Sequence, residues 1–156
     1  MSFERTTSQI LFDNGTHKCI SFTSLVKGEG IQANQFLIID HDRAAVLDPG
    51  GDLTYVPLTM ELNRYTKLKN LDYVMASHQD PDIITSMPRW LVYTDAKVVA
   101  SKLWARFLPH LNSAFMSDRM KGNWEDRLIE LADTGQVIPL GESAIVAIPA
   151  HFLHSV

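Results

Sequence analysis

Cysteine is nearly absent from this chain of 156 residues, which contains one copy, Cys19. A single cysteine excludes an internal disulfide. The polar start, MSFERTTSQ, carries Glu4 and does not have the pattern of a secretory signal. We therefore expect a reducing, cytoplasmic location, with Cys19 as a small buried strand residue rather than a nucleophile.

Long apolar runs and an excess of basic charge are also missing. No run of about 18 or more apolar residues occurs, so we expect no membrane-spanning segment and no membrane partner. The formal net charge is -4, and the lysines and arginines are scattered along the chain, which argues against a nucleic-acid partner. Hydrophobic residues make up 46% of the chain and charged residues 21%, as is ordinary for one globular domain of this length.

The first third of the chain has the pattern of β-hairpins. Asn14-Gly15 is a strong hairpin signal between two apolar stretches, and His41-Asp42-Arg43 separates two more. The stretch DPGGD then stops the run, because proline and glycine do not continue a strand. We predict strands at residues 8–13, 17–22, 35–40 and 44–48.

After residue 52 helical and strand patterns alternate. The apolar spacing predicts helices at residues 53–65, 84–93 and 101–111, and strands at 71–77, 96–101, 137–140 and 143–150. In the third helix we expect Leu103, Phe107 and Leu111 to share one face. Residues 112–125 are harder to interpret, since Met116, Met120 and Trp124 are helically spaced but Gly122 favours a break. The order predicts α/β layers, with helices packed on a mixed sheet.

The stretch YVMASHQDPDIITS places three polar side chains directly after an apolar strand. His78, Asp80 and Asp82 alternate along the chain, and on extended backbone such side chains point the same way. Pro81 keeps Asp80 out of the helical conformation, which helps to hold the segment extended. The pattern indicates a metal site past the end of a strand. The alternative is a polar turn in which Asp82 caps the next helix and His78 is merely exposed.

A second histidine group follows the last predicted strand. His151 and His154 come after the apolar run AIVAIPA, again just past the end of a strand. One short segment rarely surrounds an ion, so donors from two segments strengthen the metal interpretation. A structural histidine with a local hydrogen-bond partner remains the alternative for His154.

These stretches together resemble the metallo-β-lactamase superfamily, and within it the flavodiiron-like branch. The superfamily has a strand ending in aspartate-glycine, then H-x-H-x-D-H, and later a lone histidine. The flavodiiron branch has a glutamate in place of the second histidine. The corresponding stretches here are VLDPGGD, YVMASHQDPDI and PAHFLHS. The resemblance covers nearly the whole chain.

The resemblance implies a fold and a set of ligands. It predicts an αββα sandwich of which residues 1–156, as one domain, supply the N-terminal half to two-thirds. On this match His78 is the first ligand, Asp80 takes the place of the glutamate, Asp82 that of the aspartate and His154 that of the later histidine. His78, Asp80 and His154 would hold one metal and Asp82 would contact the second. Asp48 would support the ligands from the DPGG turn.

Three departures from the family pattern limit this expectation. Ile83 stands where the last histidine of the motif is expected, and isoleucine cannot bind a metal. Asp80 is one methylene shorter than glutamate. The bridging aspartate and final histidine of the family would follow residue 156, so we expect the sandwich and the site to be incomplete within these residues.

The resemblance also implies a function, namely a di-iron centre that binds or reduces dioxygen or nitric oxide. Carboxylates mixed with imidazole suit iron, with manganese or zinc as alternatives. No flavodoxin-like domain is present, so electrons would come from a separate flavin reductase, or oxygen would be bound without turnover. One rival is a hydrolase that activates water on its metal. Another is a non-catalytic sensor or remnant domain, which Ile83 favours. Because an incomplete sandwich exposes an apolar sheet, we also consider a homodimer.

Overall fold

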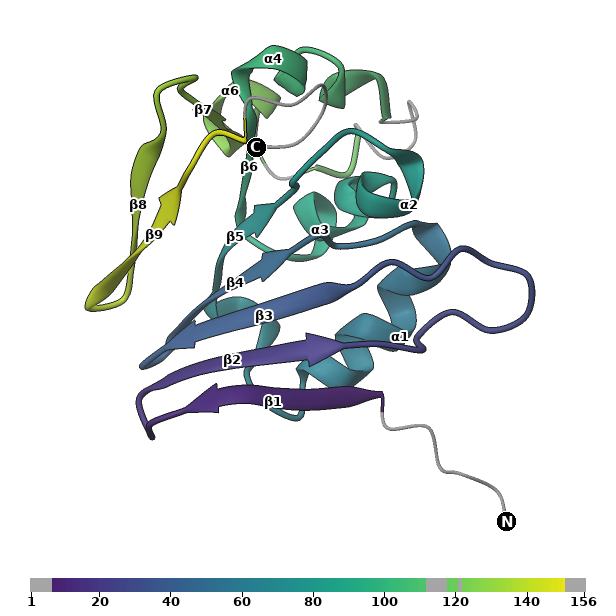
Figure 1. Ribbon diagram of the computed structural model, residues 1–156. Helices are drawn as coiled ribbons and strands as arrows, with labels where there is room; N and C mark the ends of the chain where they lie inside the picture. The colour runs from purple at the N-terminus through teal and green to yellow at the C-terminus, as the bar shows by residue number, and fades with distance from the viewer. Residues whose placement is uncertain (1–6, 112–117, 121, 151–156) are drawn as a thin grey trace.

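The computed structural model describes residues 7–111, 118–120 and 122–150, and its centre is a seven-stranded sheet in the order β1-β2-β3-β4-β5-β6-β7 (Figure 1). The first four strands pair antiparallel, and β4 to β7 pair parallel. The sheet is therefore mixed, as predicted. Its strands are β1 (Ser8–Asp13), β2 (His17–Phe22), β3 (Gln35–Asp40), β4 (Arg43–Leu47), β5 (Leu71–Met75), β6 (Lys97–Ser101) and β7 (Leu128–Leu131).

The hairpin predicted at Asn14-Gly15 is confirmed. Gly15 has φ of +99°, a conformation that costs glycine little. The Asn14 side-chain oxygen accepts hydrogen bonds from the backbone N–H groups of Thr16 (3.2 Å) and His17 (2.7 Å). This turn sets the pairing of β1 with β2, in which Cys19 is a half-buried strand residue.

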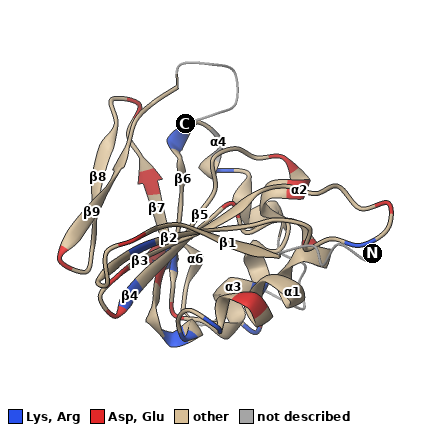
Figure 2. Ribbon diagram, turned by 60° about the horizontal axis from the view of Figure 1, so that its bottom comes forward, with Lys and Arg blue, Asp and Glu red and all other residues tan. Residues whose placement is uncertain are grey.

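Helices cover one face of the sheet, and Figure 2 shows α1 and α3 on the side opposite the β8–β9 hairpin. Ile20, Phe22 and Leu37 point to the helical side and pack with Leu58 and Trp90. The helices are α1 (Asp52–Leu62), α2 (Pro81–Ile84), α3 (Met87–Tyr93), α4 (Lys102–Ala105) and α6 (Trp124–Arg127), with 3-10 turns η1 (Leu68–Asn70) and η2 (Leu108–Leu111). None of the helices within the described ranges is long and apolar enough to cross a membrane.

A two-stranded hairpin lies on the other face of the sheet. It consists of β8 (Gln136–Leu140) and β9 (Ser143–Ala147), joined by a turn at Gly141-Glu142. Ile138 and Leu140 are buried against Ala45, Met75 and Val99 of the main sheet. The layers of the described residues are therefore helices, a seven-stranded sheet and a two-stranded sheet.

The prediction of one continuous helix at residues 101–111 is wrong. The chain forms α4 and, after a turn, η2. Pro109 has no N–H to donate to the carbonyl of Ala105 four residues earlier, so the α-helix does not continue. Leu103 is 62% and Phe107 51% exposed, so the expected shared buried face does not form. The helix predicted at 84–93 starts later than expected, as α3 (Met87–Tyr93), and residue 84 belongs to the separate short helix α2.

Strand β7 was not predicted from the sequence, and a buried arginine holds the segment before it. Arg127 donates through Nε to the carbonyl oxygen of Ala96 (3.1 Å) and through Nη2 to that of Thr94 (3.0 Å). Burial lowers the pKa of this guanidinium, while Asp95 nearby raises it. These bonds attach the start of β7 to the loop before β6, the strand with which it pairs.

Candidate metal centre

The candidate site lies where β4 and β5 end side by side. These strands are parallel neighbours, so their carboxyl ends meet at one edge of the sheet. The backbone N–H of Asp48, just after β4, donates to the carbonyl of Met75 at the end of β5 (2.8 Å). The DPGG turn and the H-x-D-x-D segment, far apart in the sequence, thereby become neighbours.

The DPGG turn is held in a strained but well-supported shape. Asp48 has φ of +56°, uncommon for a residue other than glycine. Gly50 has φ of +80°, and a Cβ there would lie 2.6 Å from a side-chain carbon of Thr54. The Gly50 N–H donates to the carbonyl of Ile83 (2.7 Å), and the Ser86 N–H donates to the carbonyl of Gly50 (3.1 Å). These bonds hold α2 and α3 against the turn, with Asp48 at the end of β5.

Hydrogen bonds to Ser77 connect Asp48 with His78. The Asp48 Oδ1 accepts from the backbone N–H of Ser77 (2.8 Å), and the Asp48 Oδ2 accepts from the Ser77 hydroxyl (2.9 Å). The Ser77 oxygen is in turn 3.0 Å from Nδ1 of His78. The Ser77 hydroxyl donates its proton to Asp48. The hydrogen bond between the Ser77 oxygen and the His78 ring therefore requires a proton on Nδ1 of the ring. In a neutral His78 the ring lone pair, which a metal ligand needs, is then on Nε2.

The charge on Asp48 is poorly compensated. Burial raises the pKa of Asp48; the two hydrogen bonds from Ser77 and the nearby His78 lower it, and the negative charge of Asp82 raises it further. The net direction is upward. A carboxylate in this state gains from an added positive charge close by.

Asp80 lies near His78, but His78, Asp80 and Asp82 are not alternate residues of one extended segment. The strand ends at Met75, residues 77 and 78 form a bend, and Asp82 lies inside α2. Asp80 has the extended conformation expected before Pro81 (φ −64°, ψ 140°), and its Oδ2 is 3.5 Å from Nε2 of His78. The segment is thus bent and then helical, because Pro81 begins a helix instead of continuing the strand.

The alternative interpretation, a polar turn in which Asp82 caps the next helix and His78 is exposed, does not match the structure either. Asp80, not Asp82, occupies the N-cap position of α2, and no side-chain cap bond is present there. The His78 side chain is only 22% exposed and faces both Ser77 and Asp80. His78 is therefore not simply a solvent-exposed ring.

His151 and His154 lie outside the described residues. Within the described ranges no group of three or more His, Cys, Asp or Glu side chains is arranged to hold a metal ion. Ile83, at the place of an expected histidine, is 7% exposed and packs in the core with Ile84 and Met87. The described donors nevertheless include the imidazole–carboxylate pair of His78 and Asp80.

An apolar cavity of about 310 Å³ adjoins this edge of the sheet. It lies between the main sheet and β9, and Ser77 forms part of its lining. Leu47, Met75, Val99 and Ile145 are among its apolar walls. Ser77 was not among the predicted site residues, because its role depends on its contact with Asp48, 29 residues away in sequence.

A family model described as ODP family beta lactamase matches residues 31–156. A solved structure of a peroxy diiron species of the chemotaxis sensor ODP superposes with a TM-score of 0.75 at 30% identity, covering 96% of this chain and 56% of that one. An apo state of the chemotaxis sensor ODP from T. denticola gives 0.73 at 32% identity, covering 95% and 55%.

Two further matches extend the comparison. A diflavin flavoprotein, A 4, of Synechocystis sp. (strain ATCC 27184 / PCC 6803 / Kazusa) is 33% identical over 95 residues, which are 58% of this chain and 16% of that protein. The subclass B3 metallo-β-lactamase MEM-A1 from a soil metagenome shares the fold, with a TM-score of 0.65 at 19% identity and 86% of this chain covered. The chain spans about half the length of the solved relatives, as the expected incomplete αββα sandwich implies, and the metallo-β-lactamase fold is confirmed.

Proposed function

Because this chain belongs to the ODP family of β-lactamase-fold proteins, we propose that it is an oxygen-binding domain with a di-iron centre related to flavodiiron proteins. The observation that supports this most is the connected series Asp48–Ser77–His78, which presents Nε2 of a histidine next to a carboxylate at the edge of the sheet. The solved relative is described as a diiron species of a chemotaxis sensor.

The donor chemistry fits iron. His78 offers a neutral imidazole nitrogen, and Asp80 and Asp82 offer carboxylate oxygens, a mixture that suits iron or manganese better than zinc. We propose that His78 and Asp80, with His154, hold one metal and that Asp82 contacts the second. Once bound, iron would supply an open position at which dioxygen binds. His154 is a ligand in this proposal because of its sequence pattern alone.

The described residues have distinct roles in this proposal. Ser77 fixes the plane and the tautomer of the His78 ring, since its oxygen occupies Nδ1. Asp48 orients Ser77 through two hydrogen bonds and contributes negative charge behind the ring. The apolar walls of the cavity beside Ser77 would suit a small apolar molecule such as dioxygen.

We favour binding without turnover over catalysis. Ile83 is committed to the hydrophobic core and leaves the second metal position one donor short. Loss of a donor affects turnover more than folding, and the two solved relatives that are 30% and 32% identical to this chain are both structures of the chemotaxis sensor ODP. A separate flavin reductase is then not required for the binding itself.

The test is optical. Purified protein is loaded anaerobically with ferrous iron and then exposed to air, and its visible absorption is compared with that of His78→Ala treated in the same way. We expect an absorption band in the wild type that requires dioxygen, and its loss in the variant. Circular dichroism of both proteins controls for folding.

Two results would overturn the proposal. An iron-loaded wild type whose spectrum is the same with and without air would contradict oxygen binding. A band of equal intensity in His78→Ala would contradict the assignment of the site. Zinc in the purified protein, together with cleavage of a lactam or phosphodiester, would replace the proposal with the hydrolase.

A further inference from the structure

The opposite end of the sheet carries a second group of ionisable side chains, centred on Asp40. This residue ends β3, and its side chain is almost fully buried. Its Oδ2 accepts hydrogen bonds from the backbone N–H groups of Glu142 (2.6 Å) and Ser143 (3.0 Å), which lie in the turn of the β8–β9 hairpin. Figure 1 shows that turn next to the end of the sheet where β3 passes into β4. Asp40 thus joins the two sheets.

The hairpin turn is built to approach Asp40 closely. Gly141 has φ of +60°, and a Cβ at this position would lie 2.5 Å from Oδ2 and 2.7 Å from the backbone oxygen of Asp40. A residue larger than glycine would push the turn away from the main sheet. The contact is therefore specific and close, although the two segments are about a hundred residues apart in sequence.

His41 bridges the two turns with both of its ring nitrogens. Its Nδ1 is 3.4 Å from Oδ2 of Asp40, and its Nε2 is 3.6 Å from Oε2 of Glu142. A neutral imidazole has one N–H, so its other nitrogen would direct a lone pair at a negatively charged carboxylate. Only the doubly protonated ring can donate to both carboxylates. Both carboxylates therefore face an N–H of His41 only when the ring has taken up a proton, while the Glu142 side chain, 80% exposed, also reaches solvent.

His17 adds a second imidazole on the other side of Asp40. Its Nδ1 is 3.3 Å from Oδ1 of that residue. The remaining charged groups of this region have partners elsewhere or face solvent. Lys18 pairs with Asp13 of β1 (2.7 Å), Arg43 donates through Nε to Asp72 of β5 (2.8 Å), and Asp42 is exposed.

We propose that His41, with Asp40 and Glu142, forms a proton-dependent latch between the β3–β4 turn and the β8–β9 turn. The latch closes more tightly as the pH falls from about 8 to about 5.5, the range in which imidazole gains its charge. By linkage, a contact that needs the protonated ring is present at the lower pH and is lost as the pH rises.

Asp40 itself stays charged over this range. Burial raises the pKa of Asp40, but the backbone N–H of Glu142 and the bonds from His17 and His41 outweigh it and bring the pKa to about 2. The latch therefore responds to the histidines and not to Asp40. What it holds is the β8–β9 hairpin, whose β9 residues line the apolar cavity near Ser77. The second sheet would consequently be held more firmly against the first in acid, whether or not a metal is bound.

Hydrogen–deuterium exchange of the Glu142 and Ser143 amides tests the latch, with rates corrected for intrinsic exchange at each pH. Between about pH 8 and about pH 5.5 we expect the protection of these two amides to rise on the order of threefold to tenfold. Amides of Val74 and Val98 in the sheet core report global opening and serve as the internal reference. The metal-free protein is used, so failure of the metal proposal does not affect the result.

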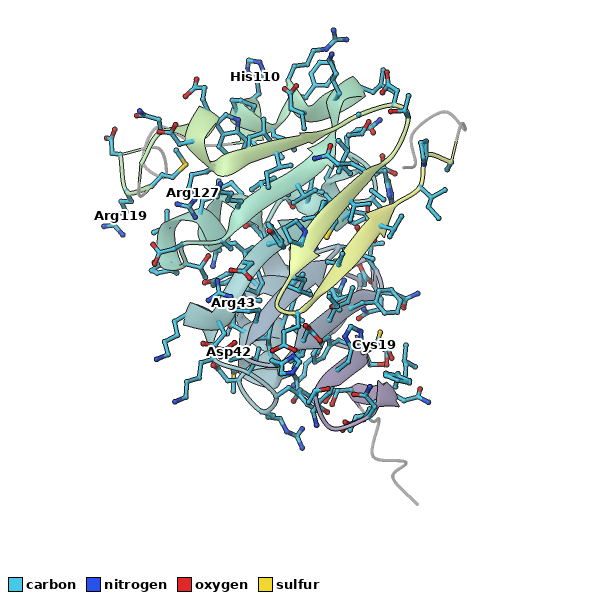
Figure 3. All side chains as sticks on the ribbon, turned by 90° about the vertical axis from the view of Figure 1, so that its left-hand side faces the viewer. Cys19, Asp42, Arg43, His110, Arg119 and Arg127 are labelled. Carbon is cyan, nitrogen blue, oxygen red and sulfur yellow. The ribbon has the colours of Figure 1, made fainter. Side chains whose placement is uncertain are left out.

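Matched variants identify the residue responsible. His41→Asn removes the titrating ring but tolerates the φ of +55° at this position, so the turn is kept. Glu142→Gln removes only the carboxylate that faces Nε2. Both variants should lose most of the pH dependence. His110→Asn should retain it, because His110 lies in η2, far from Asp42 and Arg43 of the β3–β4 turn (Figure 3).

The latch would be contradicted by equal protection of the two amides at both pH values in the wild type. It would also be contradicted if His41→Asn folded normally and kept the wild-type pH dependence. In that case His17 or the general acid response of the chain would account for the change.

Discussion

Asp40 and Asp48 stand at opposite ends of the main sheet, each just at the end of a strand, and their environments differ in kind. Asp40 receives two backbone N–H groups from the β8–β9 turn and faces two imidazoles. Asp48 receives one backbone N–H and one hydroxyl, both from Ser77, and has the negative charge of Asp82 nearby. Burial acts in the same direction on both carboxyls.

The pKa values nevertheless move in opposite directions. For Asp40 the donors outweigh burial and lower the pKa to about 2, whereas for Asp48 burial prevails and raises the pKa. A carboxylate with enough donors stabilises the fold by itself. A carboxylate with too few is stabilised by a cation, which is what the candidate metal centre would provide. The comparison supports a structural role for Asp40 in joining the two sheets and is consistent with the proposed role of Asp48 behind a metal ligand.

Substitution of Asp40, whose carboxylate joins the two sheets, should have the largest effect on thermal stability. Asp40→Ala leaves the N–H groups of Glu142 and Ser143 without their acceptor, so the melting temperature should fall on the order of 5 °C or more. Asp48→Asn keeps an oxygen that can accept from Ser77 and relieves a strained charge, so the change should be roughly 1 °C. Differential scanning calorimetry of the metal-free proteins measures both. A larger fall in melting temperature for Asp48→Asn than for Asp40→Ala would contradict the structural role of Asp40.

Gly141→Ala should be the next most damaging change. The new Cβ would collide with Asp40, and φ of +60° is unfavourable for alanine, for a total of about 2–3 kcal/mol in the free energy of unfolding. Gly28→Ala is the matched control, since Gly28 has φ of +75° and no atom lies within 4 Å of the position that a Cβ would take. It should cost only about 1 kcal/mol. Urea denaturation distinguishes the two, and equal losses would mean that the close approach to Asp40 contributes nothing.

Removal of the hydroxyl between Asp48 and His78 should weaken metal binding. Ser77→Ala removes the contact that holds the ring of His78 and leaves one oxygen of Asp48 without its donor. We expect about tenfold lower iron affinity, with little change in stability. Competition with a colorimetric chelator gives the affinity. Ser77→Thr, which keeps a hydroxyl, should retain most of it. If Ser77→Ala binds iron as tightly as the wild type, the serine does not position the ring.

The smallest effect is on acid unfolding. The lowered pKa of Asp40 contributes stability that is present above about pH 4 and is lost as the pH falls towards 2. The raised pKa of Asp48 acts in the opposite sense, because its protonation in acid removes a cost. Asp40→Asn should therefore flatten the fall in stability in acid, and Asp48→Asn should steepen it. Urea midpoints between about pH 6 and about pH 3 measure the slopes, and identical slopes in all three proteins would contradict both directions.

Much of the sheet could be predicted because its signals are local. Asn14-Gly15 and the alternating stretches on either side define the first hairpin without any distant contact. The DPGG turn could be located for the same reason. Strand β7 has only four residues, and the side chain that fixes its start, Arg127, bonds to carbonyls about thirty residues away. No local sequence pattern predicts such a strand.

The candidate site was predictable by residue type but not by geometry. His78, Asp80 and Asp82 were identified from their spacing, whereas their arrangement on a bend and a helix depends on how Pro81 begins α2. Ser77 acquires its role only when the end of β5 meets Asp48, 29 residues away in sequence. The contact between Asp40 and Glu142 has a separation of 102 residues and no sequence signature.

The iron content of His78→Ala tests the central claim most directly. Wild-type protein, His78→Ala and the exposed-histidine control His110→Ala are loaded with ferrous iron anaerobically, desalted and measured by plasma mass spectrometry. The account predicts bound iron in the wild type and the control, and loss of most of it in His78→Ala. Equal iron in all three proteins would show that the end of β5 is not a metal centre.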